Sequence, residues 1–257
     1  MSLAETLIVV PCLSDNYAYL LRDTHSGEVA VIDVPEAAPI LAELDRRGWS
    51  ATQVWLTHHH WDHVDGLPDL LAQHAASVVG AKADADRLPP LDLAVTEGDT
   101  VKLGALSADV YDVSGHTMNH IALHVPAARL LFTADSLMAL GCGRVFEGEM
   151  AQMWNSLQKF KDLAPHTLIC SGHEYTETNA RFALTIEPEN TDLQARVDKI
   201  REARTEGRPT VPSHLGEELA TNPFMRAHLE SVKSSLDMSS ASDAEVFAEI
   251  RRRKDAF

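Results

Sequence analysis

The chain has 257 residues, 45% of them hydrophobic, and its 38 acidic and 22 basic residues give a formal net charge of -16 at pH 7. This length is enough for one large domain, or for a medium domain with a smaller partner. The acidic balance argues against nucleic acid as a partner, because a phosphate backbone requires a basic surface.

Cysteine usage and the N-terminal residues both indicate a cytoplasmic protein. Cys12, Cys142 and Cys170 are far apart and form no Cys-x-x-Cys pair, which predicts free thiols in a reducing compartment. The first residues, MSLAETLIVVPCLSDNY, lack a basic region followed by a long apolar stretch, so we expect no signal peptide. We also find no run apolar enough to span a membrane and expect no membrane partner.

The first two-thirds of the chain alternates strand-like with helix-like runs. Pro39–Arg47 has helical spacing and ends at Gly48, a residue suited to capping a helix, and Leu67–His74 and Met150–Leu163 also have helical spacing. Short apolar runs bounded by Pro, Asp or Gly predict strands. These runs are Leu7–Val10, Tyr17–Leu21, Val29–Asp33, Gln53–Thr57, Ser77–Gly80, Thr100–Leu103, Ala108–Val113, His120–Val125, Leu130–Ala134 and Thr167–Cys170.

After about residue 174 the pattern changes to charged segments with helical periodicity. Three helices are expected there, with no strand between them: Glu174–Ile186, Asp192–Thr205 and Asp243–Lys254. Ser231–Ser242 is polar and Ser-rich, which predicts a loop. The sequence therefore predicts an α/β domain over residues 1–173 and a helical C-terminal domain over residues 174–257.

The densest group of candidate metal ligands follows a predicted strand and reads Thr57-His58-His59-His60-Trp61-Asp62-His63. Imidazole and carboxylate groups in a loop after a buried strand suit divalent transition metals. Because alternate residues of an extended stretch share a face, His58 and His60 can reach one metal while His59 points away. Asp62 and His63 could then reach a second metal.

Three further predicted strands also end in a ligand-type side chain, namely His116, Asp135 and His173. Singly, such a His could be a surface residue and such an Asp a helix cap, but their occurrence together with the 57–63 motif favours a metal site. The ends of strands in an open α/β sheet converge on one crevice. Seven ligands exceed the need of one tetrahedral zinc, so we predict two metals, bridged by Asp135 through both carboxylate oxygens.

The other eight histidines are given no metal role, although two of them, His120 and His124, flank a strand close to the predicted site. The eight are His25, His59, His74, His120, His124, His166, His214 and His228.

Residues 57–63 match the T-H-x-H-x-D-H signature of the metallo-β-lactamase superfamily, and His116-Thr117, Asp135 and His173 complete the pattern of its dinuclear hydrolases. Within that superfamily the chain resembles the glyoxalase II family, the hydroxyacylglutathione hydrolases, over nearly its whole length. The segments that carry this resemblance are Asp15-Asn16-Tyr17, Gly141-Cys142-Gly143-Arg144, His173-Glu174-Tyr175-Thr176, Asn222-Pro223-Phe224-Met225-Arg226 and Arg253-Lys254-Asp255.

The resemblance implies an αβ/βα sandwich followed by a helical domain that helps to bind glutathione. It implies that one metal is held by His58, His60 and His116. The second metal would be held by Asp62, His63 and His173, with Asp135 as the bridge. Zinc is the expected metal, and iron and manganese are the alternatives.

The resemblance also implies a substrate and contacts to it. S-D-lactoylglutathione would be hydrolysed to D-lactate and glutathione in methylglyoxal detoxification, through attack by a hydroxide shared between the metals, with Asp62 and Asp135 as the catalytic carboxylates. Glutathione contacts would come from Arg144, Phe146, Tyr175, Arg251 and Lys254.

Three features of these contact residues bear on binding. A lysine is common in the family at position 144 and a tyrosine at position 146, so Arg144 changes the donor geometry and Phe146 lacks a hydroxyl. Arg251 and Lys254 share a helix face and could hold the carboxylates of glutathione, or could merely complement a helix C-terminus.

We expect a monomer or a weak oligomer.

Other functions remain as alternatives. A mononuclear iron glutathione-persulfide dioxygenase shares much of the ligand set, but such enzymes generally lack a long helical extension. A β-lactamase would need an export signal, and an RNA-processing nuclease is disfavoured by the acidic charge. A non-catalytic metal-binding protein is disfavoured because all seven ligands are present.

Overall fold

The computed structural model describes residues 6–257, which divide into two compact units. The first unit runs to Asp112 and includes Asn119–Thr133, and the second consists of Val113–Met118 and Ala134–Phe257. The boundary predicted at residue 173 therefore lies inside the second unit. Residues 1–5 lie outside the described part of the chain. They belong to the N-terminal segment for which no signal peptide was expected.

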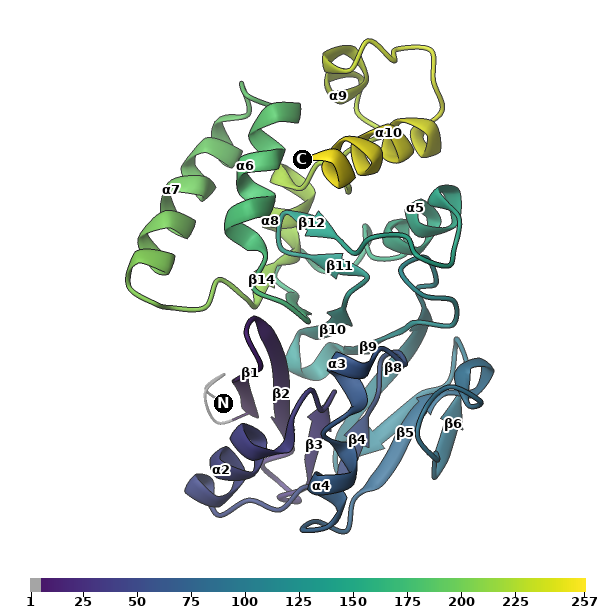
Figure 1. Ribbon diagram of the computed structural model, residues 1–257, viewed down its shortest axis with the longest axis vertical. Coiled ribbons are helices and arrows are strands. Elements are labelled where there is room, and N and C mark those ends of the chain that lie inside the picture. Colours follow the sequence, from purple (N-terminus) through teal and green to yellow (C-terminus); the bar gives the residue numbers. More distant parts are fainter. Residues whose placement is uncertain (1–5) are drawn as a thin grey trace. The chain divides into compact units, whose positions relative to one another are not determined.

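The first unit begins with a mixed sheet whose six strands lie side by side in chain order (Figure 1). The strands are β1 (Leu7–Cys12), β2 (Asn16–Arg22), β3 (Val29–Ile32), β4 (Gln53–Trp55), β5 (Ser77–Ala81) and β6 (Leu93–Val95). β1 to β3 pair antiparallel, whereas β3 to β6 pair parallel. Helix α2 (Ala37–Arg47) makes the crossover from β3 to β4, and Gly48 ends it in the left-handed conformation, as predicted.

The remaining strands of the first unit pair antiparallel, in the order β7, β8, β9, β10. They are β7 (Thr100–Leu103), β8 (Leu106–Asp112), β9 (Ile121–Val125) and β10 (Leu130–Ala134). β8 and β10 both run opposite to β9, so they run parallel to each other and end at the same edge. His116 and Asp135 follow these two strand ends in the sequence. The antiparallel pairing differs from the open parallel sheet assumed from the sequence, but it brings the strand ends together in the same way.

Large aromatic side chains join the two sheets of this unit. The ring of Phe132 on β10 meets Tyr19 on β2 at a centroid distance of 5.7 Å and Trp55 on β4 at 6.4 Å, both edge to face. Phe132 and Trp55 are fully buried. The amide of Gln53 on β4 also donates a hydrogen bond to the carbonyl of Lys102 on β7 (2.7 Å). Two sheets facing each other across one core form the predicted sandwich.

The second unit is mainly helical (Figure 1). Its helix α6 packs along α7, and α10 packs against α5. Its short strands are β11 (Leu137–Met138), β12 (Gly141–Cys142), β13 (Leu168–Ser171) and β14 (Ser213–His214). Its helices are α5 (Met150–Gln158), α6 (Thr176–Ile186), α7 (Thr191–Thr205), α8 (Leu215–Thr221), α9 (Glu230–Ser235) and α10 (Asp243–Ala256).

Two expectations for the C-terminal region are wrong, and both were decided by tertiary contacts. Ser231–Ser242 was expected to be a loop, but α9 occupies its first residues, because Val232 is fully buried and Lys233 pairs with Asp243 (2.8 Å). No strand was expected there, but β14 pairs with β13 through only two residues, too few to leave a period in the sequence. No helix within residues 6–257 is both long and apolar enough to cross a membrane.

Candidate functional site

The 57–63 motif lies in the first unit, in the loop after β4 and in the short helix α3 (Trp61–Val64). His58 Nε2 and His60 Nδ1 lie 3.2 Å apart. Two nitrogens bound to one tetrahedral zinc, each at about 2.05 Å, would lie roughly 3.3 Å from each other. The two histidines of the extended part of the motif therefore have the spacing of two ligands of one metal, and their binding to the same metal stays a prediction.

His58 and His63 are oriented by a buried carboxylate that the sequence reasoning missed. Asp33, directly after β3, accepts hydrogen bonds from the Thr57 amide (2.9 Å), the Thr57 hydroxyl (2.8 Å) and His63 Nδ1 (2.8 Å). Because the Thr57 hydroxyl donates to Asp33, its oxygen is free to accept from His58 Nδ1 at 3.0 Å. Both imidazoles thus keep the Nε2 lone pair for a metal.

The signal that could have revealed Asp33 is its position. It stands at the carboxyl end of β3, and β3 pairs parallel with β4, which leads into the motif. The carboxyl ends of neighbouring parallel strands share one edge of a sheet, where ligands bind.

Asp62 is fixed by Asn16 at the start of β2. The Asn16 amide donates to the backbone carbonyl of Asp62 (2.9 Å) and to its Oδ2 (3.1 Å). Asp62 Oδ2 lies 4.0 Å from His63 Nε2. Asn16 was part of the family resemblance, and its structural role is to hold this carboxylate.

The two neighbouring histidines of the first unit behave differently. His59 points away from His58 and His60 to Asp84, with a distance of 2.9 Å between its Nδ1 and the carboxylate. His120 is fully buried and stacks on the ring of His58, with centroids 4.5 Å apart and planes 16° apart. His120 therefore supports the ring of a candidate ligand, a contact that its position beside a strand did not reveal.

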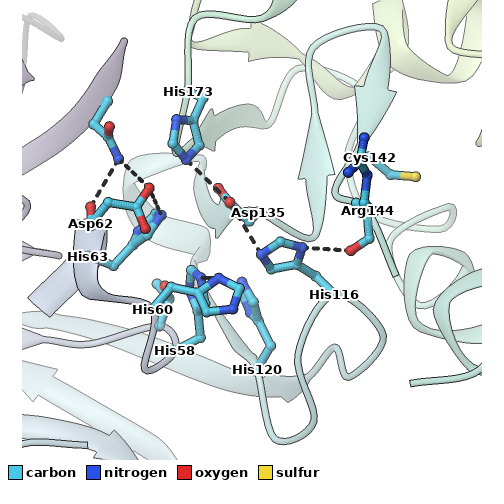
Figure 2. A network of polar contacts seen from close by, with 12 residues as sticks. His58, His60, Asp62, His63, His116, His120, Asp135, Cys142, Arg144 and His173 are labelled. Carbon is cyan, nitrogen blue, oxygen red and sulfur yellow. Dashed lines mark hydrogen bonds and ion pairs between the residues drawn. The ribbon is translucent and has the colours of Figure 1, made fainter. Parts of the chain in front are cut away.

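The second unit holds its own cluster, made of His116, Asp135 and His173 (Figure 2). Asp135 Oδ2 lies 3.4 Å from His116 Nε2 and 3.3 Å from His173 Nε2. All three side chains are buried. Both distances match the spacing of roughly 3.3 Å expected between two ligands of one tetrahedral metal. The same oxygen, Oδ2, lies close to both imidazoles, and the bridge through both carboxylate oxygens stays a prediction.

His116 is oriented by the backbone of a distant residue. Its Nδ1 donates to the carbonyl of Arg144 at 2.7 Å, so the proton sits on Nδ1 and the Nε2 lone pair faces Asp135 (Figure 2). A ring nitrogen donating to a carbonyl is the usual support of a metal-bound histidine. The donors of each unit therefore fit divalent metal ions in chemistry and spacing, and most of them are buried.

Two aromatic rings in the second unit adjoin its histidines. Tyr175 stacks on His173, with centroids 4.7 Å apart and planes 9° apart, and the ring of Phe146 lies 5.4 Å from that of His116. Tyr175 is 41% exposed and Phe146 60% exposed. Both rings therefore lie beside candidate ligands and are partly exposed to solvent.

The predicted cationic contacts also lie in the second unit, near one carboxylate. Asp255 on α10 pairs with Arg144 (3.3 Å) and with Arg251 (2.9 Å). Arg251 is buried and also donates to the carbonyl of Cys142 (2.9 Å). Half-buried Lys254 lies over the Phe182 ring, and burial, with the nearby Arg251 and Arg181 charges, lowers its pKa to about 8.

The three cysteines are free thiols, as predicted, and all are buried. Burial raises the pKa of Cys12 to about 12 and that of Cys142 to about 11, and it also raises the pKa of Cys170. A thiol must ionise to act as a nucleophile. None of the three is therefore suited to nucleophilic catalysis.

Family comparisons divide the chain into two parts. Residues 13–173 match the family described as the metallo-beta-lactamase superfamily, and residues 174–257 match the family described as the hydroxyacylglutathione hydrolase C-terminus. Similar full-length proteins include the hydroxyacylglutathione hydrolases of Ruegeria pomeroyi and Jannaschia sp. Each is 61% identical over 251 residues, covering 98% of this chain and 98% of the relative.

Solved structures with low sequence identity share the fold. BLEG-1 B3 metallo-beta-lactamase matches with a TM-score of 0.66 and 18% identity, over 86% of this chain and 99% of that one. ETHE1 from Myxococcus xanthus matches with a TM-score of 0.65 and 24% identity, over 95% of this chain and 90% of that one. The predicted αβ/βα sandwich with a helical C-terminal region is confirmed.

Proposed function

This chain belongs to the hydroxyacylglutathione hydrolase family of the metallo-β-lactamase superfamily, and we propose that it hydrolyses S-D-lactoylglutathione to D-lactate and glutathione. It is a glutathione thioester hydrolase, and its clustered His and Asp donors bind divalent metal. Hydrolysis of this substrate serves the removal of methylglyoxal, because the glutathione adduct of methylglyoxal yields this thioester.

The ligands of the proposed metal centre are assigned from the family pattern of the seven residues. One metal is assigned to His58, His60 and His116, and the other to Asp62, His63 and His173. Asp135 would be the ligand common to both metals. The observation that carries this assignment is the pair of distances at Asp135, whose Oδ2 lies 3.4 Å from His116 Nε2 and 3.3 Å from His173 Nε2. A carboxylate oxygen between two imidazoles, each of which contributes to a different triad, suits a bridging ligand.

Two divalent ions bound here supply Lewis acidity and a water acidic enough to act as the nucleophile near neutral pH. The chain's own residues hold this centre in shape. Asp33 keeps His63 and Thr57 in place, the Arg144 carbonyl fixes His116, and Asn16 holds the Asp62 carboxylate. No thiol of the chain takes part, because all three are buried and resist ionisation.

Substrate recognition is assigned to the second unit. Tyr175 and Phe146 offer exposed rings beside His173 and His116. Arg144 and Lys254 supply positive charge for the carboxylates of glutathione, which a chain of net charge -16 would otherwise repel. Arg251 contributes charge from a buried position and orders Arg144 through the shared partner Asp255.

The proposal is tested by counting metals in the purified protein and following thioester loss from S-D-lactoylglutathione with and without a chelator. We expect about two metals per chain and hydrolysis that the chelator abolishes. Re-addition of Zn²⁺, Fe²⁺ or Mn²⁺ to the stripped protein then identifies which metal restores the rate; zinc is the ion we propose.

One result would replace this function with another. A protein that carried a single iron, left the thioester intact and consumed oxygen with glutathione persulfide would be a dioxygenase. A protein that bound metal and turned over neither substrate would be a metal-binding protein without catalysis. A cytoplasmic location and a monomeric or weakly oligomeric state remain predictions, checked by fractionation and by light scattering.

A further inference from the structure

The hairpin β11–β12 lies in the second unit, between Asp135 and Arg144 in the sequence. Each of its strands has only two residues, and they pair with each other alone. Its turn places Leu140 at a φ of 55°, a left-handed conformation that branched and bulky side chains avoid. A two-stranded hairpin of this kind is not stable by itself. Its shape must therefore be set by other parts of the unit.

Side chains from the C-terminal region bind the hairpin backbone. The Asn222 amide donates to the carbonyls of Met138 (3.1 Å) and Gly141 (3.0 Å), on the two sides of the turn. The Asn179 amide, from α6, donates to the carbonyl of Ala139 (3.1 Å). Asn222 is completely buried and Asn179 is nearly so.

A buried carboxylate completes this attachment. Glu218 on α8 accepts a hydrogen bond from the amide of Leu140 (2.8 Å) and one from Asn222 (3.0 Å). Its own charge is balanced by Arg196 and by the hydroxyl of Ser213, which donates at 2.6 Å. Three carbonyls and one amide of the turn are thus bonded to side chains beyond residue 174.

The other end of the hairpin contacts the candidate metal ligands directly. The amide of Gly143 donates to the carbonyl of Ser136 (3.2 Å), which closes the base of the hairpin beside Asp135. A Cβ at Gly143 would lie 2.0 Å from the Asp135 carbonyl and 2.8 Å from His116 Nδ1, so only glycine fits. The next residue, Arg144, supplies the carbonyl that accepts from His116 Nδ1. A shift of the hairpin would move both contacts.

The division of the chain into compact units agrees with this connection. The loop Val113–Met118, which carries His116, and the chain from Ala134 onward cluster with the C-terminal helices. Three of the seven proposed metal ligands therefore belong to the same compact unit as Asn179, Glu218 and Asn222.

We propose that Asn222, Glu218 and Asn179 are positioning residues for the metal centre, acting through the β11–β12 hairpin on Asp135 and His116. The C-terminal region then has a role besides contacting glutathione, because it sets the geometry of ligands that precede it in the sequence. This inference rests on the proposed metal centre. It assigns a function to the Asn of the Asn222-Pro223-Phe224 segment, which no substrate contact explains.

The test compares full-length wild-type protein with Asn222→Ala and Asn179→Ala, each loaded with Zn²⁺. Zinc content and the rate of zinc transfer to a colorimetric chelator are measured alongside kcat and KM for S-D-lactoylglutathione. We expect zinc loss to become about tenfold faster for Asn222→Ala and about threefold faster for Asn179→Ala, since removal of groups that support ligands typically weakens metal binding by at least tenfold. We expect kcat to fall while KM changes less than twofold.

Asn190→Ala is the matched control. Asn190 caps α7 by accepting from the Leu193 amide and donates to the Ala220 carbonyl (3.0 Å), so its bonds stay within the C-terminal region. It should lower the melting temperature without accelerating zinc loss. Asn179→Ala removes a single hydrogen bond and keeps the test meaningful if Asn222→Ala does not fold.

Two failures are distinguishable. If Asn179→Ala and Asn222→Ala released zinc at the wild-type rate while losing thermal stability as Asn190→Ala does, the two asparagines would be purely structural and the inference would be overturned. A rise in KM with zinc retained would likewise overturn it, in favour of a role in substrate binding alone. If wild-type protein bound no zinc, iron or manganese, the metal centre itself would fail.

Discussion

The candidate metal ligands of the two units are distributed differently along the chain. In the first unit the candidate ligands His58, His60, Asp62 and His63 lie within one short segment. In the second unit His116, Asp135 and His173 come from three segments separated along the chain. The contacts that hold these ligands in place also differ between the two units. The first cluster is held by Asp33 and Thr57 at neighbouring strand ends, whereas the second depends on a backbone carbonyl after a hairpin that helices hold in place.

This difference teaches that a compact motif can have its geometry set locally, while a dispersed one must obtain its geometry from tertiary packing. The extended stretch at His58–His60 places both imidazoles on one face through backbone alternation alone. No local rule brings His116 to Asp135, and their 3.4 Å separation depends on the course of β8 and β10 and on the contacts around Gly143.

The largest effect is expected at the centre of the dispersed cluster. Asp135→Asn keeps the size of the side chain but removes the charge that we propose bridges the metals. We expect a loss of about 4 kcal/mol of transition-state stabilisation, or roughly a thousandfold in kcat/KM, measured with S-D-lactoylglutathione. Asp162→Asn, an exposed site in the same unit, should leave kcat/KM unchanged. Wild-type turnover by Asp135→Asn with two metals bound would rule out the bridge.

The supporting carboxylate of the compact cluster should have a smaller effect. Asp33→Asn tolerates the φ of 56° but can no longer accept from Thr57 and His63 at once. We expect metal affinity to fall by about 10-fold to 100-fold and stability to fall by about 1–3 kcal/mol. Metal competition assays and urea denaturation measure the two.

Asp23→Asn provides a matched comparison for Asp33→Asn, because Asp23 is equally buried and also accepts from backbone amides and a hydroxyl in the first unit. It should reduce stability and leave metal affinity intact. Equal metal affinities in the two variants would show that Asp33 is a folding residue only.

A weaker effect is expected from the charge of Lys254. A lysine is charged below its pKa, and burial together with Arg251 and Arg181 lowers this pKa to about 8, against the opposing influence of Asp255 and Cys142. The positive charge is therefore present at pH 7 and lost as the pH rises through about 8. We expect KM for the anionic substrate to rise up to about tenfold between pH 7 and pH 9.

The control for this pH dependence is Lys254→Arg, which stays charged throughout and should flatten the KM profile. Because kcat depends on the metal centre, it should not follow the same titration. A wild-type KM that stayed constant from pH 7 to pH 9 would remove Lys254 from the substrate contacts.

The smallest effect is expected from Phe146→Tyr. The side chain is 60% exposed, so the added hydroxyl can reach a bound peptide without being buried. One hydrogen bond in such a position contributes about 0.5 kcal/mol, so we expect KM to fall about twofold with kcat unchanged. Arg144→Lys is measured beside it. The pair of variants distinguishes the effect of the missing hydroxyl at position 146 from the effect of the altered cation at position 144. A higher KM for Phe146→Tyr would show that an apolar ring is required there.

Much of the fold was predictable because it has a local cause. The strands of the first unit are apolar runs bounded by turn residues, and α2 ends at Gly48 as its pattern predicted. The helices α6, α7 and α10 followed from helical periodicity. The elements that escaped prediction are short. β11, β12 and β14 have two residues each, too few to show an alternation, and β6, α8 and α9 have three, seven and six residues.

The candidate ligands were predictable for a different reason. Metal chemistry restricts them to a few residue types, and the motif at 57–63 concentrates these types beyond what packing explains. Asp33 was missed because a single Asp at a strand end has many ordinary explanations. Asn179, Glu218 and Asn222 were not identified as supports for the ligands because their bonding partners lie far away; Asn222 donates to a carbonyl 84 residues earlier in the chain.

The sequence by itself determined the family and the sandwich with its helical extension, and it predicted the candidate ligands, because periodicity and motifs are properties of neighbouring residues. Only the tertiary structure decided which nitrogen of His116 faces Asp135, which oxygen of Asp135 lies between two imidazoles, and which side chains hold the hairpin beside them. These are hydrogen bonds and close contacts between segments far apart in the chain. No local pattern encodes such contacts, and their geometry is set when the second unit packs.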